Sequence, residues 1–403
     1  MMLLYIDPGT GSMLFSIFIG LAATLYFLFR LSILKFKTLF LGKKNKIQQK
    51  NSIVIYNEGD HYWPVFKPIL DEFEKRKIEI LYLTSSNADL FINENYQFIK
   101  YKFIGSGNTA FSYLNFLDAD ICLMTTPGLE VYQLKRSKFC KHYSHILHDT
   151  GDATCYRLFG IDWFDSILLS GEYQKDDIQE LEKTRLTQKK ELIIIGSTYL
   201  DYYNKKINNL PVIKNKPFTV LISPTCGSCS LLNSIGEKLL DCFINTDWKI
   251  IIRPHPQSLK SEKNLINNLN KKYNLFIWDF KTENLESLSQ ADIMISDFSG
   301  IIFDYAFLFN KPVLYHDIDF NREMYDAGDL GHDPKKFEYV KKFGIEINEN
   351  DLPNLKEIIE KTVSNNSLIH EITEIREIAW QNRGQSGEYA VNALLKYANS
   401  NDK

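Results

Sequence analysis

The stretch Ser296–Ala306, with the sequence SDFSGIIFDYA, constrains the fold of this chain more than any other segment. It follows the apolar run 291–295, which is typical of a buried strand, and it leads into residues 301–308, which are typical of a helix. A turn rich in Ser, Asp and Gly thus joins a strand to a helix. The first N–H groups of a helix lack intrahelical partners and carry partial positive charge, so they can hold a phosphate. An ordinary helix cap is the alternative, because Ser and Asp are favoured at helix starts in any protein.

A second informative segment, Arg253-Pro254-His255-Pro256, follows the apolar run 250–252. Each proline fixes its own φ and restrains the residue before it, so His255 is held stiffly at the end of a strand. Proteins with parallel α/β sheets bind their ligands at this end of the strands. We therefore predict His255 as a catalytic residue and Arg253 as a phosphate ligand. A turn that only happens to contain a His is the alternative.

Together these segments resemble the CDP-glycerol glycerophosphotransferases, the enzymes that build teichoic-acid-like poly(glycerol phosphate) chains. The resemblance rests on residues 253–256, on the stretch from Ser296 through Lys311-Pro312-Val313, and on the strand and Pro-Thr loop at 220–228. It covers residues 216–395 well and residues 51–210 more loosely. It implies an α/β fold of two Rossmann-like domains facing a cleft, the glycosyltransferase-B type.

The donor site is expected in the second of these domains. The residues predicted to bind the nucleotide phosphates are Thr225, Gly227, Ser228, Arg253, Ser296, Asp297, Ser299 and Gly300. Asp304 lies further along the helix and is predicted to brace the loop rather than to touch phosphate. The sequence contains no convincing metal-ligand cluster near these residues, so we predict neither a metal nor a cofactor.

The first domain is expected to supply a general base, and His148 is the candidate. It follows the strand-like residues 145–147 and precedes Asp149. A histidine with a pKa of about 6.5 is suited to take a proton at neutral pH, and a carboxylate such as Asp149 can orient it. The family has a His-Gly-Thr turn at a comparable place; here Asp149 replaces the Gly, and the Lys that commonly follows is missing. A capping or structural role for His148 is the alternative.

The N-terminus has the composition of a membrane anchor. Residues 13–29 contain no charged residue, and together with residues 31–34 they reach the length of about 20 residues that spans a bilayer, interrupted by Arg30. Six lysines follow between positions 35 and 50, and the positive-inside rule places this side in the cytoplasm. We predict a single-pass protein of the plasma or inner membrane with cytoplasmic catalytic domains. A cleavable signal peptide is the alternative.

Strand–turn–helix units alternate along the rest of the chain, which favours parallel sheets with crossover helices. The polar stretch 204–216 separates two runs of such units. We predict an anchor and basic linker at 1–50, an acceptor domain at 51–210 and a nucleotide-binding domain at 216–403. The net charge of −3 provides no overall basic field, so no nucleic-acid partner is predicted.

The function that these features indicate is transfer of glycerol phosphate from CDP-glycerol, or of a group from another nucleotide-activated donor. The acceptor would be a hydroxyl of a membrane-linked glycan or polyol phosphate, with release of CMP. A nucleotide-sugar-dependent glycosyltransferase of surface glycan synthesis is one alternative. A non-catalytic membrane scaffold is another, and an epimerase of similar fold ranks last.

Overall fold

The structure is a computed structural model that describes residues 21, 24–26, 51–148, 150–151, 153–210, 216–281, 283–317 and 321–398. Residues 1–50 and 51–403 form separate compact units. The predicted membrane anchor lies almost entirely outside the described residues. Among the residues that are described, no helix has both the length and the apolar character needed to cross a bilayer. The anchor therefore stays a prediction.

The first sheet of the second unit has seven strands in the order β3-β2-β1-β4-β5-β6-β7, and neighbouring strands run parallel. Its strands are β1 (Asn51–Asn57), β2 (Ile80–Thr84), β3 (Ile99–Phe103), β4 (Ala119–Met124), β5 (Cys140–Ile146), β6 (Ser166–Leu169) and β7 (Glu191–Ile194). The helices between them are α2 (Trp63–Lys75), α3 (Asn108–Leu114) and α4 (Gln174–Arg185), and α5 (Thr198–Ile207) follows β7. The inner strands β2, β4 and β6 are buried along their whole length, because helices cover both faces of a parallel sheet.

The second sheet has six strands in the order β10-β9-β8-β11-β12-β13, again with parallel neighbours. Its strands are β8 (Thr219–Ile222), β9 (Lys249–Ile252), β10 (Ile277–Trp278), β11 (Ile293–Ser296), β12 (Val313–Tyr315) and β13 (Gly344–Glu346). Its helices are α6 (Leu231–Ser234), α7 (Gly236–Asp241), α8 (Ser258–Ser261), α9 (Lys263–Lys272), α10 (Leu285–Gln290), α11 (Ile301–Phe309), α12 (Lys335–Phe343), α13 (Leu355–Val363) and α14 (Asn366–Ala379). The predicted pair of parallel α/β sheets is confirmed.

We call residues 51–210 the N-terminal lobe and residues 216–381 the C-terminal lobe. The strand order reverses between β1 and β4 in one sheet and between β8 and β11 in the other. Ligands of open parallel sheets bind at the carboxyl ends of the strands beside such a reversal. The predicted loops after β8, β9 and β11 all lie at this position in the C-terminal lobe.

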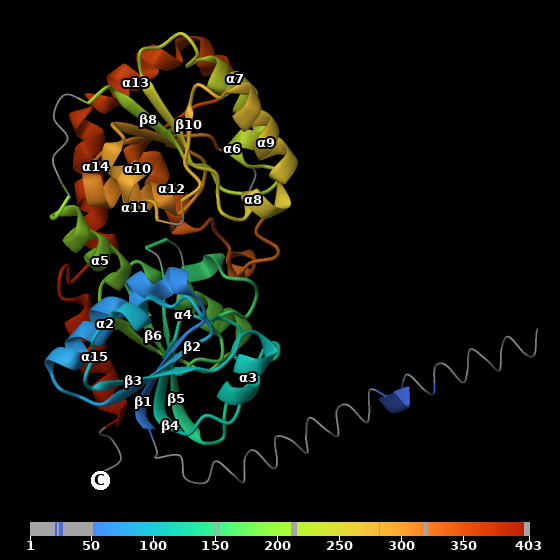
Figure 1. Cartoon of the computed structure of the whole chain (residues 1–403), viewed down its shortest axis with the longest axis vertical. Coiled ribbons are helices and arrows are strands. Elements are labelled where there is room, and N and C mark those ends of the chain that lie inside the picture. Colours follow the sequence, from blue (N-terminus) through green and yellow to red (C-terminus); the bar gives the residue numbers. More distant parts are fainter. Residues whose placement is uncertain are drawn as a thin grey trace, which may run out of the picture. The chain divides into compact units, whose positions relative to one another are not determined.

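The last helix, α15 (Ser386–Ala398), returns to the N-terminal lobe and packs beside α2 (Figure 1). The break before it is organised by Asp201 of α5, whose carboxylate accepts the Trp380 indole N–H at 2.9 Å and the Gly384 amide at 2.7 Å. The amide of Ser386 donates to the same carboxylate at 3.0 Å and starts the new helix. The last part of the predicted 216–403 domain thus completes the core of the other lobe.

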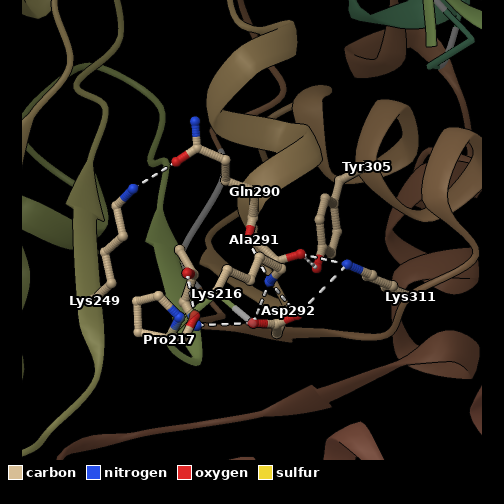
Figure 2. A network of polar contacts seen from close by, with 9 residues as sticks. Lys216, Pro217, Lys249, Gln290, Ala291, Asp292, Tyr305 and Lys311 are labelled. Atoms are coloured by element: carbon tan, nitrogen blue, oxygen red, sulfur yellow. Dashed lines mark hydrogen bonds and ion pairs between the residues drawn. The ribbon is translucent and has the colours of Figure 1, made fainter. Parts of the chain in front are cut away.

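A lysine network lies at the amino ends of the second sheet's strands, opposite the predicted site. Lys216 Nζ lies 2.6 Å from each carboxylate oxygen of Asp292, and Lys311 Nζ lies 3.8 Å from Asp292 Oδ1 (Figure 2). Lys311 also donates to the Ala291 carbonyl at 2.5 Å, and burial lowers its pKa. Lys311, part of the family-like segment, therefore braces the sheet and is remote from the strand ends that bind ligands.

The two lobes are also joined by a clasp, which we define as residues 156–162 and 322–329 together with Arg185. An isolated antiparallel bridge pairs Arg157 with Tyr325, and the Asp326 amide donates to the Tyr156 carbonyl at 2.8 Å. Arg185 lies 2.8 Å from Asp162 and 2.9 Å from Asp326, which is fully buried. Burial raises the pKa of Asp326 to about 7 despite the nearby guanidinium.

Candidate active site

A pocket of about 310 Å³ is lined by residues of both lobes and brings most of the predicted site together. The N-terminal lobe contributes His61, Tyr62, Val65, His148 and Tyr199. The C-terminal lobe contributes Ser223, Pro224, Arg253, Pro254, His255, Pro256, Asn284, Ser299, Gly300, Ile301 and Asp304. The predicted catalytic residues His148 and His255, which are far apart in sequence, thus line one cavity.

His255 is fixed by its own segment. The backbone amide of Gln257 donates to His255 Nδ1 at 3.1 Å, so the neutral ring carries its hydrogen on Nε2. The side chain is half-buried, and this burial lowers the pKa of His255. A neutral imidazole with an Nε2–H group is suited to donate a hydrogen bond to a phosphate oxygen.

Arg253 lines the pocket, but its guanidinium is engaged elsewhere. It donates to Asp279 Oδ2 at 2.7 Å and to the Lys281 carbonyl at 2.6 Å, and the residue is 7% exposed. These contacts hold the end of β9 against the segment after β10. The geometry therefore gives Arg253 a bracing role beside the pocket, and its direct phosphate contact stays a prediction.

The start of helix α11 opens on the pocket through Ser299, Gly300 and Ile301. Two residues slightly earlier in the chain, Ser296 and Asp297, face inward. Ser296 is fully buried and donates to the Ser223 carbonyl at 2.5 Å, and Asp297 is 1% exposed. Ser299 and Gly300 are therefore placed where the sequence analysis expected phosphate ligands, whereas Ser296 and Asp297 lie beneath them and do not line the pocket.

Asp297 organises the loops around it. Its carboxylate accepts the amides of Thr225 at 2.9 Å, Leu231 at 3.1 Å and Ser299 at 3.2 Å. Burial raises its pKa, while these backbone hydrogen bonds oppose the rise. A short polar residue after β11 is thus needed to join two loops, which is a structural reason for the Ser-Asp-x-Ser-Gly pattern.

The Thr225–Ser228 loop lies beside Asp297 and not on the pocket, as far as the described residues define it. The Thr225 amide is taken by Asp297, and the Gly227 amide donates to Glu262 at 2.5 Å. Gly227 has a φ of 103°, which favours glycine, and Ser228 is exposed. Thr225, Gly227 and Ser228 do not line this pocket, and their predicted phosphate contacts stay predictions.

His148 lies just beyond the carboxyl end of β5 and is held by aromatic residues. Its Nδ1 is 3.0 Å from the hydroxyl oxygen of Tyr156, and its ring contacts Tyr62 edge-on at a centroid distance of 5.3 Å. Asp149, the predicted orienting carboxylate, lies outside the described residues. The described support for His148 is therefore Tyr156, which the sequence analysis did not identify.

Further pocket residues were also missed. His61 and Tyr62 precede α2, and Tyr199 of α5 donates its hydroxyl to Asp304 Oδ2 at 3.0 Å. This contact connects the lobes and supports the bracing role predicted for Asp304, which is 8% exposed. None of these aromatic residues belongs to a recognisable motif. Their positions near strand ends are the one sequence feature that could have indicated a place in the pocket. In the described part of the chain, no three His, Cys, Asp or Glu residues are placed to hold a metal ion.

Comparison with known families places part of the chain beside one family. The model of the family described as CDP-Glycerol:Poly(glycerophosphate) glycerophosphotransferase matches residues 172–330, which include the Arg253–Pro256 and Ser296–Gly300 segments. Over these residues the chain is similar to the CDP-glycerol glycerophosphotransferases. The resemblance predicted from the sequence is confirmed over this region, which is less than half of the 403 residues.

Solved structures share the fold of this glycerophosphotransferase-like chain. The wall teichoic acid polymerase TagF, in a crystal soaked with CDPG, is 15% identical with a TM-score of 0.57, and the match covers 90% of this chain and 97% of that one. The UDP-GlcNAc 2-epimerase from Neisseria meningitidis, bound to UDP-GlcNAc, is 14% identical with a TM-score of 0.55 and coverages of 86% and 100%. At these identities the matches confirm the glycosyltransferase-B-like fold alone. No protein with a curated description matches the chain.

Proposed function

We propose that this protein transfers glycerol phosphate from CDP-glycerol to a hydroxyl group of a cell-surface polymer precursor and releases CMP. The family match and the fold shared with TagF support the choice of donor and polymer class. The single observation that carries the proposal is the pocket that His148 and the α11 start line from opposite lobes.

In the proposed reaction, an acceptor hydroxyl oxygen attacks the phosphorus that bears glycerol. A new P–O bond forms, the bond from this phosphorus to the oxygen that bridges the two phosphates breaks, and CMP leaves with the bridging oxygen. The N–H groups at the start of α11 and His255 Nε2–H are suited to stabilise charge on the diphosphate. His148, on the opposite side, is predicted from the sequence to take the hydroxyl proton.

We further propose that the N-terminal segment anchors the protein to the cytoplasmic face of the membrane. The apolar run 13–29 and the lysines after it support this placement. A soluble nucleotide donor and a membrane-linked acceptor would meet at such a position. Residues 13–20 and 27–50 lie outside the described structure, so this part of the proposal rests on the sequence.

The proposal is tested by incubating the full-length protein, in detergent, with CDP-glycerol, UDP-GlcNAc or a GDP-sugar and with membrane extract as acceptor. Nucleotide products are separated by chromatography. We expect CMP from CDP-glycerol, and a loss of roughly 10²-fold or more for His148→Ala, within the range for removing an acid–base or charge-stabilising group. The matched control is His370→Ala, because His370 is exposed on α14, where its Nε2 lies 3.3 Å from Glu374, and it does not line the pocket.

The alternatives give different results. Release of UDP or GDP would indicate a nucleotide-sugar glycosyltransferase. Release of no nucleotide by the wild type, with the protein folded, would contradict catalysis and favour the scaffold.

A further inference from the structure

The hydroxyl group of Tyr156 lies between two imidazole rings. Its oxygen is 3.2 Å from His145 Nε2 and 3.0 Å from His148 Nδ1. His145 lies within β5 and is fully buried, whereas His148 faces the pocket. The three side chains therefore form a hydrogen-bonded line from the core of the N-terminal lobe to the candidate active site.

His145, at the buried end of this line, indicates which group donates in each of the two hydrogen bonds. Burial lowers the pKa of His145 to about 3, so its ring is neutral near pH 7. His145 Nδ1 is buried and has no hydrogen-bond partner among the described residues. Buried N–H groups without a partner are rarer than buried acceptors without one. His145 is therefore best satisfied with its hydrogen on Nε2, donated to the Tyr156 oxygen.

The hydroxyl hydrogen of Tyr156 is then directed to His148. The Tyr156 oxygen accepts from His145 in this arrangement, and it lies at hydrogen-bond distance, 3.0 Å, from His148 Nδ1, to which its hydroxyl donates. A neutral imidazole that accepts at Nδ1 carries its hydrogen on Nε2. His255 has the same arrangement, since Gln257 donates to its Nδ1.

The position of Tyr156 depends on the C-terminal lobe. Its backbone carbonyl accepts the Asp326 amide at 2.8 Å, and the next residue, Arg157, pairs with Tyr325. The Tyr156 ring stands edge-on to both imidazoles, at 80° to His145 and 70° to His148. The clasp therefore fixes the hydroxyl group relative to His148.

We propose that Tyr156 is a positioning residue that holds His148 with an Nε2–H group toward the pocket, so that the two histidines donate hydrogen bonds to the diphosphate from opposite lobes. This inference rests on the proposed function and replaces the general-base role of His148 with a donor role. Phosphoryl transfer depends mainly on positioning and charge stabilisation, so a histidine base is not required for it. In this scheme the hydroxyl proton leaves with the phosphate of CMP or passes to solvent, which balances the step.

The first test measures the tautomer directly. Nitrogen-15 NMR of the full-length protein with labelled histidine distinguishes Nδ1–H from Nε2–H, and the resonance lost in His148→Gln assigns His148. We expect Nε2–H in the wild type and a mixture of tautomers in Tyr156→Phe. An Nδ1–H tautomer in the wild type would overturn the proposal, whether or not the protein releases CMP.

The second test uses a pair of substitutions at His148. The amide nitrogen of Gln can occupy the position of Nε2–H but cannot act as a base, whereas Ala removes the donor. We expect CMP release by His148→Gln to stay within about 10-fold of wild type and His148→Ala to lose 10²- to 10³-fold, typical of removing one donor to developing charge. Equal loss in both variants would contradict the donor role and restore the base. The tautomer measurement does not depend on activity, so it separates failure of this inference from failure of the proposed function.

Discussion

The two histidines that face the pocket are held in different ways. His255 is fixed within four consecutive residues, by two prolines and the Gln257 amide. His148 depends on Tyr156, which in turn is bonded to His145 in the core and to Asp326 of the other lobe. The edge of the pocket around His255, which we call the C-terminal edge, is thus built from neighbouring residues in the sequence. The edge around His148, the N-terminal edge, is built from contacts between residues that only the fold brings together.

The two edges should therefore respond differently when the contacts between the lobes are disturbed. Apart from the Tyr199–Asp304 contact, the C-terminal edge has its supports within one sheet and its loops, so it should largely keep its shape when the lobes move apart. The N-terminal edge should change when the clasp is disturbed. Substitutions at the buried carboxylate of each edge, Asp297 and Asp326, test this distinction.

The largest effect on stability is expected at Asp297. Asp297→Ala removes the acceptor of three backbone amides, of which the Leu231 amide is buried and the other two are partly buried, and we expect a loss of about 3 kcal/mol in the free energy of unfolding. Urea unfolding measures this loss. Ser228→Ala, in the same region but exposed, should change stability by less than about 0.5 kcal/mol. Equal stability of Asp297→Ala and wild type would show that the C-terminal edge does not depend on this carboxylate.

A smaller, pH-dependent effect is expected at Asp326. Its pKa of about 7 in the folded protein lies above its ordinary value, so the folded state binds the proton more tightly than the unfolded state. Stability from this group is present at low pH and is lost as pH rises from about 4 to about 7. Asp326→Asn cannot ionise, so the wild type should lose about 2 kcal/mol relative to this variant between pH 5 and pH 8.

The control for this comparison is Asp329→Asn, which alters the more exposed carboxylate on the same guanidinium, with 38% of its side chain exposed. It should show little of the pH effect. Parallel pH profiles for wild type and Asp326→Asn would contradict the raised pKa. An unchanged His148 tautomer in Asp326→Asn would show that the clasp does not control the N-terminal edge.

The sequence predicted those parts of the protein that depend on neighbouring residues. The apolar runs of the inner strands, the stiff Arg253–Pro256 segment and the helix start at Ser299 and Gly300 are all local patterns. The edge strand β3 was not predicted because lysines alternate with its apolar residues, and β13 was not predicted because it has only three residues.

The residues that the sequence analysis missed or misplaced make contacts with residues that are far from them in the sequence. Ser296 and Asp297 have the residue types of phosphate ligands, yet only the fold shows that they point inward and bond the neighbouring loops. Tyr156 belongs to no recognisable motif. Its role depends on the path of the chain after β5, which leads into the clasp. Asp201 organises the return of the chain by accepting hydrogen bonds from residues about 180 positions away.

The most direct test of the account is the dissociation constant of CDP-glycerol for the full-length protein, measured by isothermal titration calorimetry. The account predicts that CDP-glycerol binds, that CMP competes with it, and that His255→Ala weakens binding by at least about 10-fold through loss of a donor to phosphate. His370→Ala should bind as the wild type does. Equal affinity in His255→Ala and wild type, or a preference for uridine nucleotides, would contradict the claim that this pocket holds the diphosphate of CDP-glycerol.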